Sequence, residues 1–322
     1  MVDTEEEFDW GQNFARENVG TSSIPAQAAA HRIYDRLGVV PTYILDYPVA
    51  TDPRAVAFLG ELRDSGKAAI GAHLHPWVTP PHEEEVTTRN SYHCNLPPAL
   101  ERRKIEVLTE TIEDRFGARP TIFKAGRHGF GPNTADVLAD LGYKVDCSYV
   151  PFTSFAGHGG PDFRAVPDQP FWLDARSRLL EIPTTAGFIG PAAAMGEQAA
   201  WLFDNRQAAR LRLPGILGRS GLVARSRLSP EGVSAEEQCR LIETMVKRGR
   251  RSFNLVYHSP SLAPGHTPYV RTKADLTRFL ATIEQVLTWF RDELGGRFTT
   301  PDQVHREMAD ELDSMAGTKI AV

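Results

Sequence analysis

Short apolar runs rich in β-branched residues alternate along the chain with amphipathic stretches that carry helix start and stop signals. This alternation predicts parallel strands joined by helices. A first helix is expected in AAAHRIYDRLG, ending at Gly38, and the strand VVPTYILDYP follows it. Asp52 and Pro53 predict the N-cap and first turn of a second helix, which ends near Gly66 before the strand AAIGAHLH.

The same order continues through the middle of the chain. A helix within ALERRKIEVLTETIEDRFG, the strand TIFKAG, a short helix in NTADVLADLG and the strand YKVDCSY complete five βα-like units. Later strands are expected in LLEIPTT and SFNLVYHS, and a long helix in DLTRFLATIEQVLTWFRDEL. We therefore predict a single α/β domain over residues 1–322 with a barrel-like arrangement, in which functional groups gather at the C-terminal strand ends.

Residues 190–235 interrupt this rhythm. Their sequence predicts a helical insertion or cap with a basic end. Trp201 and Phe203 lie in an apolar stretch of it, AAWLF, and we expect both to be helix core.

Composition narrows the class of protein. With 322 residues, of which 41% are hydrophobic, the chain can bury a full core. The net charge of −5 without a long basic run gives no reason to expect a nucleic-acid partner, and a neutral or polar small substrate fits better. The three cysteines form no C-x-x-C pair, so neither a disulfide framework nor a thiolate zinc site is indicated.

The chain has no apolar run of about 20 residues, and its acidic beginning, MVDTEEEFDW, is unlike a signal peptide. We therefore expect a cytoplasmic protein without a membrane partner. Only Met1 and Val2 precede the first acidic residue, so the true start or a leader could be missing. The oligomeric state does not follow from the sequence.

Two histidines stand one residue apart in GAHLHPWVTPP, residues 71–81. In an extended segment His73 and His75 point to the same face, and Pro76 then ends regular pairing. The pair is thus expected at the C-terminal end of the third strand, as two neutral nitrogen ligands.

Further charged or titratable residues fall at other predicted strand ends: Asp3, Glu5 and Glu6 near the start, Lys124 and Arg127 in FKAGRHGFG, and His258 in NLVYHSPSL. Each cluster alone is more often surface or core, but strand ends converge in a barrel. A carboxylate with two histidines suits zinc or a similar divalent ion. A second carboxylate could then act as a base on water, and a separate histidine as an acid.

Five segments, in this order, resemble the motifs of the polysaccharide deacetylases with the NodB homology domain, and most closely the WalW-like branch: VDTEEEFDW, IGAHLHPW, FKAGRHGFG, VDCSYVP and LVYHSPSLAPGHTPYV. The resemblance implies a distorted (β/α) barrel. It also implies metal-dependent hydrolysis of an N-acetyl or related acyl group on a carbohydrate or a sugar-bearing small molecule.

The resemblance also implies roles for particular residues. Asp3 would be the catalytic base, Glu5 the acidic metal ligand, His73 and His75 the other two ligands, and His258 the general acid. The expected cofactor is a divalent ion, with zinc as the first choice.

The sequence departs from the family pattern at three places. Glu6 competes with Glu5 as the acidic ligand, although Glu5 shares the strand face of Asp3. The histidines stand closer together than is usual, so His82 or His93 could replace His75.

The third departure is Lys124, which stands where the family tends to carry arginine. We therefore expect the nearest guanidinium, that of Arg127, to orient Asp3. Trp77 and Tyr149 are the expected substrate contacts, Trp77 because it adjoins the histidine pair and offers a flat apolar face to a sugar.

The sequence is also compatible with two alternatives to a sugar deacetylase. One is a carbohydrate-binding or regulatory protein that keeps the barrel without catalysis, and the other is a hydrolase of non-peptide C–N bonds in a non-sugar substrate.

Overall fold

The structure is a computed structural model that describes residues 1–11, 14–174, 179–198 and 200–318. Eight strands form one sheet in the order β10-β1-β2-β3-β4-β5-β7-β6, and a separate two-stranded sheet pairs β8 with β9. The strands are β1 (Val2–Thr4), β2 (Thr42–Leu45), β3 (Ala69–Leu74), β4 (Ile122–Ala125), β5 (Val145–Asp146), β6 (Phe171–Asp174), β7 (Leu179–Glu181), β8 (Ala186–Ile189), β9 (Ala224–Arg227) and β10 (Tyr257–His258).

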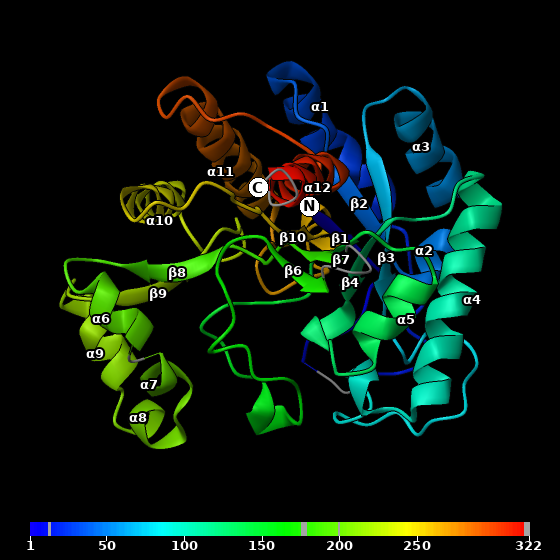
Figure 1. The fold of residues 1–322 in the computed structure, drawn as a ribbon, viewed down its shortest axis with the longest axis horizontal. Helices are drawn as coiled ribbons and strands as arrows, with labels where there is room; N and C mark the ends of the chain where they lie inside the picture. Colours follow the sequence, from blue (N-terminus) through cyan, green and yellow to red (C-terminus); the bar gives the residue numbers. More distant parts are fainter. Residues whose placement is uncertain (12–13, 175–178, 199, 319–322) are drawn as a thin grey trace.

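Most helices lie around the outside of the strands, whereas the short helices of residues 193–219 lie together beside the β8–β9 pair (Figure 1). The helices are α1 (Gln27–Leu37), α2 (Tyr47–Thr51), α3 (Pro53–Asp64), α4 (Pro98–Phe116), α5 (Thr134–Asp140), α6 (Ala193–Gln198), α7 (Trp201–Asp204), α8 (Arg206–Arg210), α9 (Leu213–Arg219), α10 (Ala235–Lys247), α11 (Lys273–Asp292) and α12 (Pro301–Thr318). Short 3-10 turns are η1 (Ile24–Ala26), η2 (His93–Asn95), η3 (Gly126–His128), η4 (Ala156–His158) and η5 (Ser259–Leu262).

The large sheet is parallel except for β6, which pairs antiparallel with β7 at one edge. The first strand lies beside the last, so the N-terminal and C-terminal parts of the chain meet in the sheet. Among the described residues β6 does not pair with β10, so the barrel is open at that seam. The predicted α/β fold with a mostly parallel, distorted barrel is confirmed.

Alternation along the strands separates the interior of the barrel from the outer core. Tyr43 and Leu45 of β2 pack outward in the large cluster beneath the helices, whereas Ile44 faces inward, in one cluster with Ile122 and Leu180. From α12, Val304 and Met308 pack against this inner cluster. The barrel interior is therefore apolar, and the polar side chains described below lie where the strands end.

Several local signals behave as predicted. Gly38 ends α1 in the left-handed conformation, with φ of 73°, and Asp52 caps α3 by accepting from the backbone N–H of Arg54.

The strands expected in YKVDCSY and SFNLVYHS are shorter than predicted, since only residues 145–146 and 257–258 pair.

The insertion carries helices α6 to α9 and returns to the body through β9, which pairs with β8. Phe203 packs against Phe188 with ring centroids 5.1 Å apart, as expected for a core residue. Trp201 is 51% exposed, so the prediction that it is core is wrong. The inner side of the insertion is already filled by a cluster that includes Phe188, Ala193 and Val223.

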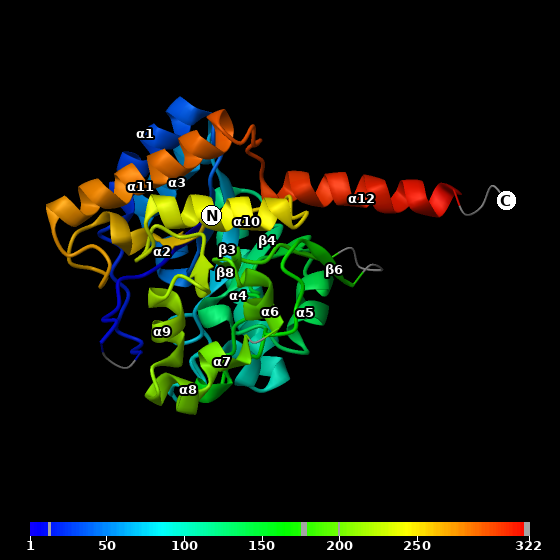
Figure 2. The same ribbon diagram turned by 90° about the vertical axis from the view of Figure 1, so that its left-hand side faces the viewer.

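The C-terminal half of helix α12 extends away from the barrel (Figure 2). In the described part of the chain, no helix combines the length and apolar character needed to cross a bilayer.

Candidate metal centre

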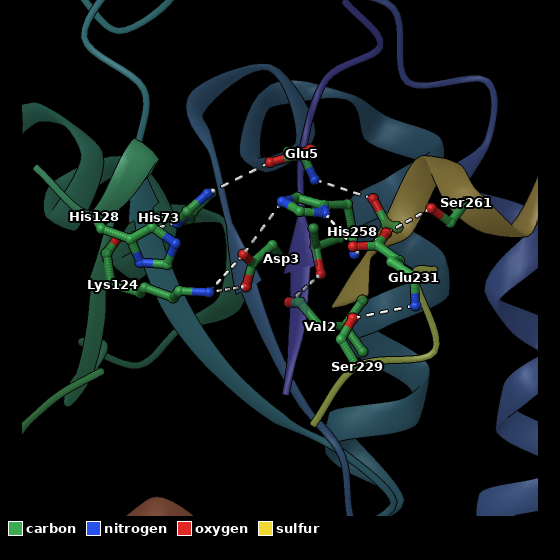
Figure 3. A network of polar contacts seen from close by, with 12 residues as sticks. Val2, Asp3, Glu5, His73, Lys124, His128, Ser229, Glu231, His258 and Ser261 are labelled. Carbon is green, nitrogen blue, oxygen red and sulfur yellow. Dashed lines mark hydrogen bonds and ion pairs between the residues drawn. The ribbon is translucent and has the colours of Figure 1, made fainter. Parts of the chain in front are cut away.

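The C-terminal ends of β1, β3, β4 and β10 bring polar side chains together in one buried cluster (Figure 3). In the sheet register Asp3 of β1 lies opposite His258 of β10, and His73 of β3 lies opposite Lys124 of β4. Because side chains alternate, Lys124 points to the same side of β4 as Ile122, into the barrel interior. The clusters that the sequence placed at separate strand ends therefore meet.

Glu5, His73 and His75 form a group of three potential metal ligands. Glu5 Oε2 lies 3.5 Å from Nε2 of His73 and 3.5 Å from Nε2 of His75, and all three side chains are buried. Nδ1 of His73 lies 3.0 Å from the carbonyl oxygen of Lys124. A carbonyl can only accept, so Nδ1 carries the proton and Nε2 keeps its lone pair. Metal-binding histidines are typically oriented in this way.

Glu6 lies on the other side of His75. Its Oε2 accepts from Nδ1 of His75 at 2.6 Å, and its Oε1 accepts from the indole N–H of Trp77 at 2.7 Å. The atoms of Glu6, Asp46 and His75 are also close enough to be a ligand set. However, this set would use Nδ1 of His75, which already donates to Glu6. The geometry thus favours Glu5 as the ligand and Glu6 as the carboxylate that orients His75.

The two loop histidines that could have replaced His75 belong to neither group of possible ligands among the described residues. His93 is buried elsewhere and its Nδ1 lies 3.0 Å from Oε1 of Glu101. His82 is likewise outside both groups. The strand-face argument for His75 therefore agrees with the geometry.

The chemistry of these side chains fits a divalent cation. Burial, with the charges of Glu6 and Asp3 added, raises the pKa of Glu5 well above its ordinary value. The other oxygen of Glu5, Oε1, is buried without a hydrogen-bond partner. Burial lowers the pKa of His75 to about 4 and that of His73 well below its usual range. Both rings are therefore neutral near pH 7 and can each offer a nitrogen lone pair to a cation. A cation would satisfy the unpartnered oxygen and reduce the repulsion between the carboxylates.

Asp3 forms a buried ion pair with Lys124, whose Nζ lies 2.8 Å from Oδ1 and 2.5 Å from Oδ2. Burial alone would raise the pKa of Asp3, but the Lys124 ammonium, with His73 and His258, lowers it well below the ordinary value. Asp3 is therefore ionised throughout the neutral range.

The prediction that Arg127 orients Asp3 is wrong. Arg127 has a left-handed backbone conformation, with φ of 53°, and its guanidinium lies over the ring of Tyr92 at 4.2 Å and bonds to Ser91. Lys124 supplies the cation instead, because a residue on the strand itself points into the barrel.

His258 is held by Glu231, a residue that the sequence reasoning missed. Nδ1 of His258 lies 2.7 Å from Oε2 of Glu231, and the backbone N–H of His258 donates to Oε1 at 3.1 Å. Burial would lower the pKa of His258, but Glu231 and then Asp3 outweigh it and raise the pKa. The free Nε2 lies 3.8 Å from Oδ2 of Asp3 (Figure 3). No pattern in SPEGVS marks Glu231 as a partner of His258.

The turn after β4 contributes two further features. Gly126 has no room for a side chain, because a Cβ would lie 2.3 Å from Cδ2 of His75 and 2.4 Å from the carbonyl oxygen of Leu74. His128 was also missed. Its Nδ1 donates to the carbonyl oxygen of Ser148 at 3.0 Å, and burial, followed by the charge of Lys124, lowers its pKa to about 3. His128 is therefore a neutral ring beside the Asp3–Lys124 pair.

The aromatic residues differ from expectation. Trp77 is only 2% exposed and lies between the rings of His75 and Phe14, each with a centroid distance of 4.3 Å, so its predicted stacking on a sugar is wrong. Tyr149 stacks on Phe163 at 4.5 Å, and its role as a substrate contact stays a prediction. Trp10 meets the ring of His258 edge-on at 5.0 Å, and its buried indole N–H has no partner.

No protein-family model matches the chain, and no curated protein matches it either. Solved structures are similar to it at low sequence identity. The putative polysaccharide deacetylase from Mycobacterium smegmatis has 16% identity and a TM-score of 0.44, covering 86% of this chain and 79% of its own. Puue allantoinase has 14% identity and a TM-score of 0.48, covering 87% and 71%. The family 4 carbohydrate esterase from Streptomyces lividans, in complex with acetate, has 11% identity and a TM-score of 0.40, covering 85% of each chain.

Proposed function

We propose that the chain is a metal-dependent hydrolase that removes an N-acetyl or related acyl group from a carbohydrate or a sugar-bearing small molecule, in the manner of the WalW-like polysaccharide deacetylases. The observation that carries the proposal is the buried Glu5–His73–His75 group beside the Asp3–His258 pair. Three ligand atoms around one position leave coordination sites free for water and substrate.

Glu5, His73 and His75 would hold the ion, and we propose zinc as its identity because nitrogen and carboxylate ligands suit it. A divalent ion bound there supplies a Lewis acid that makes water more acidic and polarises a carbonyl group.

Asp3 is the proposed base. Its carboxylate is ionised at neutral pH because Lys124 stays 2.5 Å from Oδ2. It therefore accepts the proton that water loses as the new C–O bond forms at the acyl carbon. The Lys124 ammonium keeps the carboxylate in place and charged until then.

His258 is the proposed acid. Glu231 raises its pKa, so the imidazolium persists further into the neutral range and can protonate the amine nitrogen as the C–N bond breaks. Asp3 then holds the proton taken from water. Nε2 of His258 lies 3.8 Å from Oδ2 of Asp3, so Asp3 can return that proton to His258 and restore both groups for the next cycle. The balance is one water consumed, with one carboxylic acid and one amine released.

The test is acetate release from N-acetylglucosamine and chitooligosaccharides, with and without a chelator. We expect release that the chelator abolishes and that added Zn²⁺ restores. Asp3→Asn and His258→Asn should each reduce kcat by roughly 10²–10⁴-fold, while both variants still bind the ion.

Matched controls are Asp114→Asn and His158→Asn, two exposed side chains away from the site that should leave the rate unchanged. A bound ion without acetate release from these sugars, but with release of an amine from acyclic or ureide amides, would favour the non-sugar C–N hydrolase. Sugar binding without any release or bound ion would favour the non-catalytic binding protein and overturn the proposal.

A further inference from the structure

The insertion exposes an unusual amount of apolar surface. Of the eight large apolar side chains that are exposed in the described residues, six lie between positions 195 and 222. These are Met195, Trp201, Leu211, Leu213, Ile216 and Leu222. Exposed apolar side chains concentrated in one segment are typical of a surface that binds something.

These side chains are not the core of the insertion. An inner cluster already holds the helices together, with Phe188, Ala193 and Val223 buried and Phe203 and Leu217 packed against them. On α9 Leu217 packs inward, whereas Ile216, its neighbour in the chain, is 56% exposed. The exposed residues are therefore apolar surface that the inner cluster does not cover.

The same stretch is basic although the whole chain has a net charge of −5. Residues 206–223 contain four arginines and no acidic residue. Arg210, Arg212 and Arg219 are exposed, and within the described residues none of them forms an ion pair. The acidic residues of α6 and α7, Glu197 and Asp204, are paired with Arg248 and Arg225 instead.

The insertion also lies at the functional end of the barrel. Helices α7 and α8 lie in the lower part of both ribbon views, on the side where the loop that follows β3 leads into α4, and the β8–β9 ribbon links the insertion to the body (Figures 1 and 2). A partner bound to helices α7 to α9 would therefore face the end of the molecule that carries the candidate metal centre.

We propose that this apolar and basic side of the insertion, formed by Trp201, Leu211, Leu213, Ile216 and Leu222 with Arg210, Arg212 and Arg219, docks on an anionic lipid bilayer. Tryptophan and aliphatic side chains enter the boundary between headgroups and acyl chains, and arginines bind lipid phosphates. The expectation of no membrane partner concerned spanning segments and signal peptides, and a peripheral contact needs neither.

A second copy of the chain fits this surface less well. A twofold dimer would bring the same patch against itself, so unpaired arginines would face arginines across the contact. A bilayer rich in acidic lipids offers an apolar interior for the exposed apolar side chains. It also offers negative charge that complements the arginines.

The test is cosedimentation of the full-length protein with vesicles of phosphatidylcholine alone and of phosphatidylcholine with 30 mol% phosphatidylglycerol. We expect binding to the anionic vesicles that weakens in 0.5 M NaCl and is poor on the neutral ones. Arg210→Gln with Arg212→Gln should reduce the partition coefficient roughly 25-fold, at about fivefold for each charge. Leu211→Ser with Ile216→Ser should reduce it at least tenfold on both vesicle types.

The matched control is Val40→Ser with Arg32→Gln, an exposed apolar and an exposed basic residue away from the insertion, which should bind like the wild type. Circular dichroism melting checks that each variant folds. No binding by the wild type, or equal binding by the patch variants, would overturn the proposal. So would a dimer in sedimentation equilibrium that the patch substitutions dissociate, since it would assign the patch to a second copy. Asp3→Asn should bind vesicles normally, so this test and the test of the hydrolase fail independently.

Discussion

Glu231→Gln removes one negative charge from beside His258 and keeps the shape of the side chain. In the wild type Glu231 accepts from Nδ1 of His258 at 2.7 Å, and Oε1 accepts from Ser261 Oγ at 2.6 Å. A glutamine oxygen can still accept one of these bonds. A hydrogen bond to a charged group contributes about 1.5–3 kcal/mol and a neutral one about 0.5–1.5 kcal/mol, so the imidazolium loses about 1–1.5 kcal/mol. That difference lowers the proton affinity of His258 roughly tenfold.

The sign follows from the direction of the shift. Because Glu231 raises the pKa of His258, the acid form persists to higher pH in the wild type than in the variant. The alkaline limb of the pH profile of kcat should therefore move to lower pH in Glu231→Gln, with little change in the maximum. Titration of ¹⁵N-labelled histidine side chains by NMR should show the same displacement without any substrate.

Glu243→Gln, on the exposed side of α10, is the matched control and should leave both titrations in place. The reasoning is refuted if the His258 resonance of Glu231→Gln titrates as in the wild type. It is also refuted if the resonance moves while the alkaline limb of kcat does not.

Three further substitutions test the surroundings of the candidate metal centre. Glu6→Gln should weaken binding of the ion about 10–100-fold, because His75 loses the carboxylate that orients it; competition with a chromophoric chelator measures this, and unchanged affinity would contradict it. Lys124→Met should destabilise the protein by about 3–5 kcal/mol in urea unfolding, since Asp3 is left as an unpaired buried charge. Adding Asp3→Asn should recover part of the loss, and no recovery would argue against the pair. Gly126→Ala should lower both stability and affinity for the ion, because the new Cβ meets the ring of His75; retained affinity would show that His75 is not a ligand.

Much of the site follows from local periodicity. His73 and His75 are two residues apart on a strand, so they point to one face whatever else the chain does. Asp3 and His258 come together because the ends of parallel strands meet, and their register pairing shows this directly. These relations depend on backbone geometry alone, which the sequence pattern carries well.

The remaining features depend on tertiary neighbours. Glu231 follows the insertion in a loop, and no periodic pattern connects it with His258. The left-handed turn at Arg127 is rare for a residue other than glycine, so the direction of its side chain could not be inferred. Trp77 is buried because Phe14, from a distant loop, covers it, whereas Trp201 is exposed because the inner side of the insertion is already full.

The central claim is that one divalent ion is held by Glu5, His73 and His75. Elemental analysis of the purified full-length protein tests it most directly, with the His73→Ala, His75→Ala double variant and the exposed-site variant His158→Asn measured beside it. The account predicts one divalent ion per chain in the wild type and in His158→Asn, and none in the double variant. A wild type without a stoichiometric ion, or a folded double variant that retains it, would contradict the account.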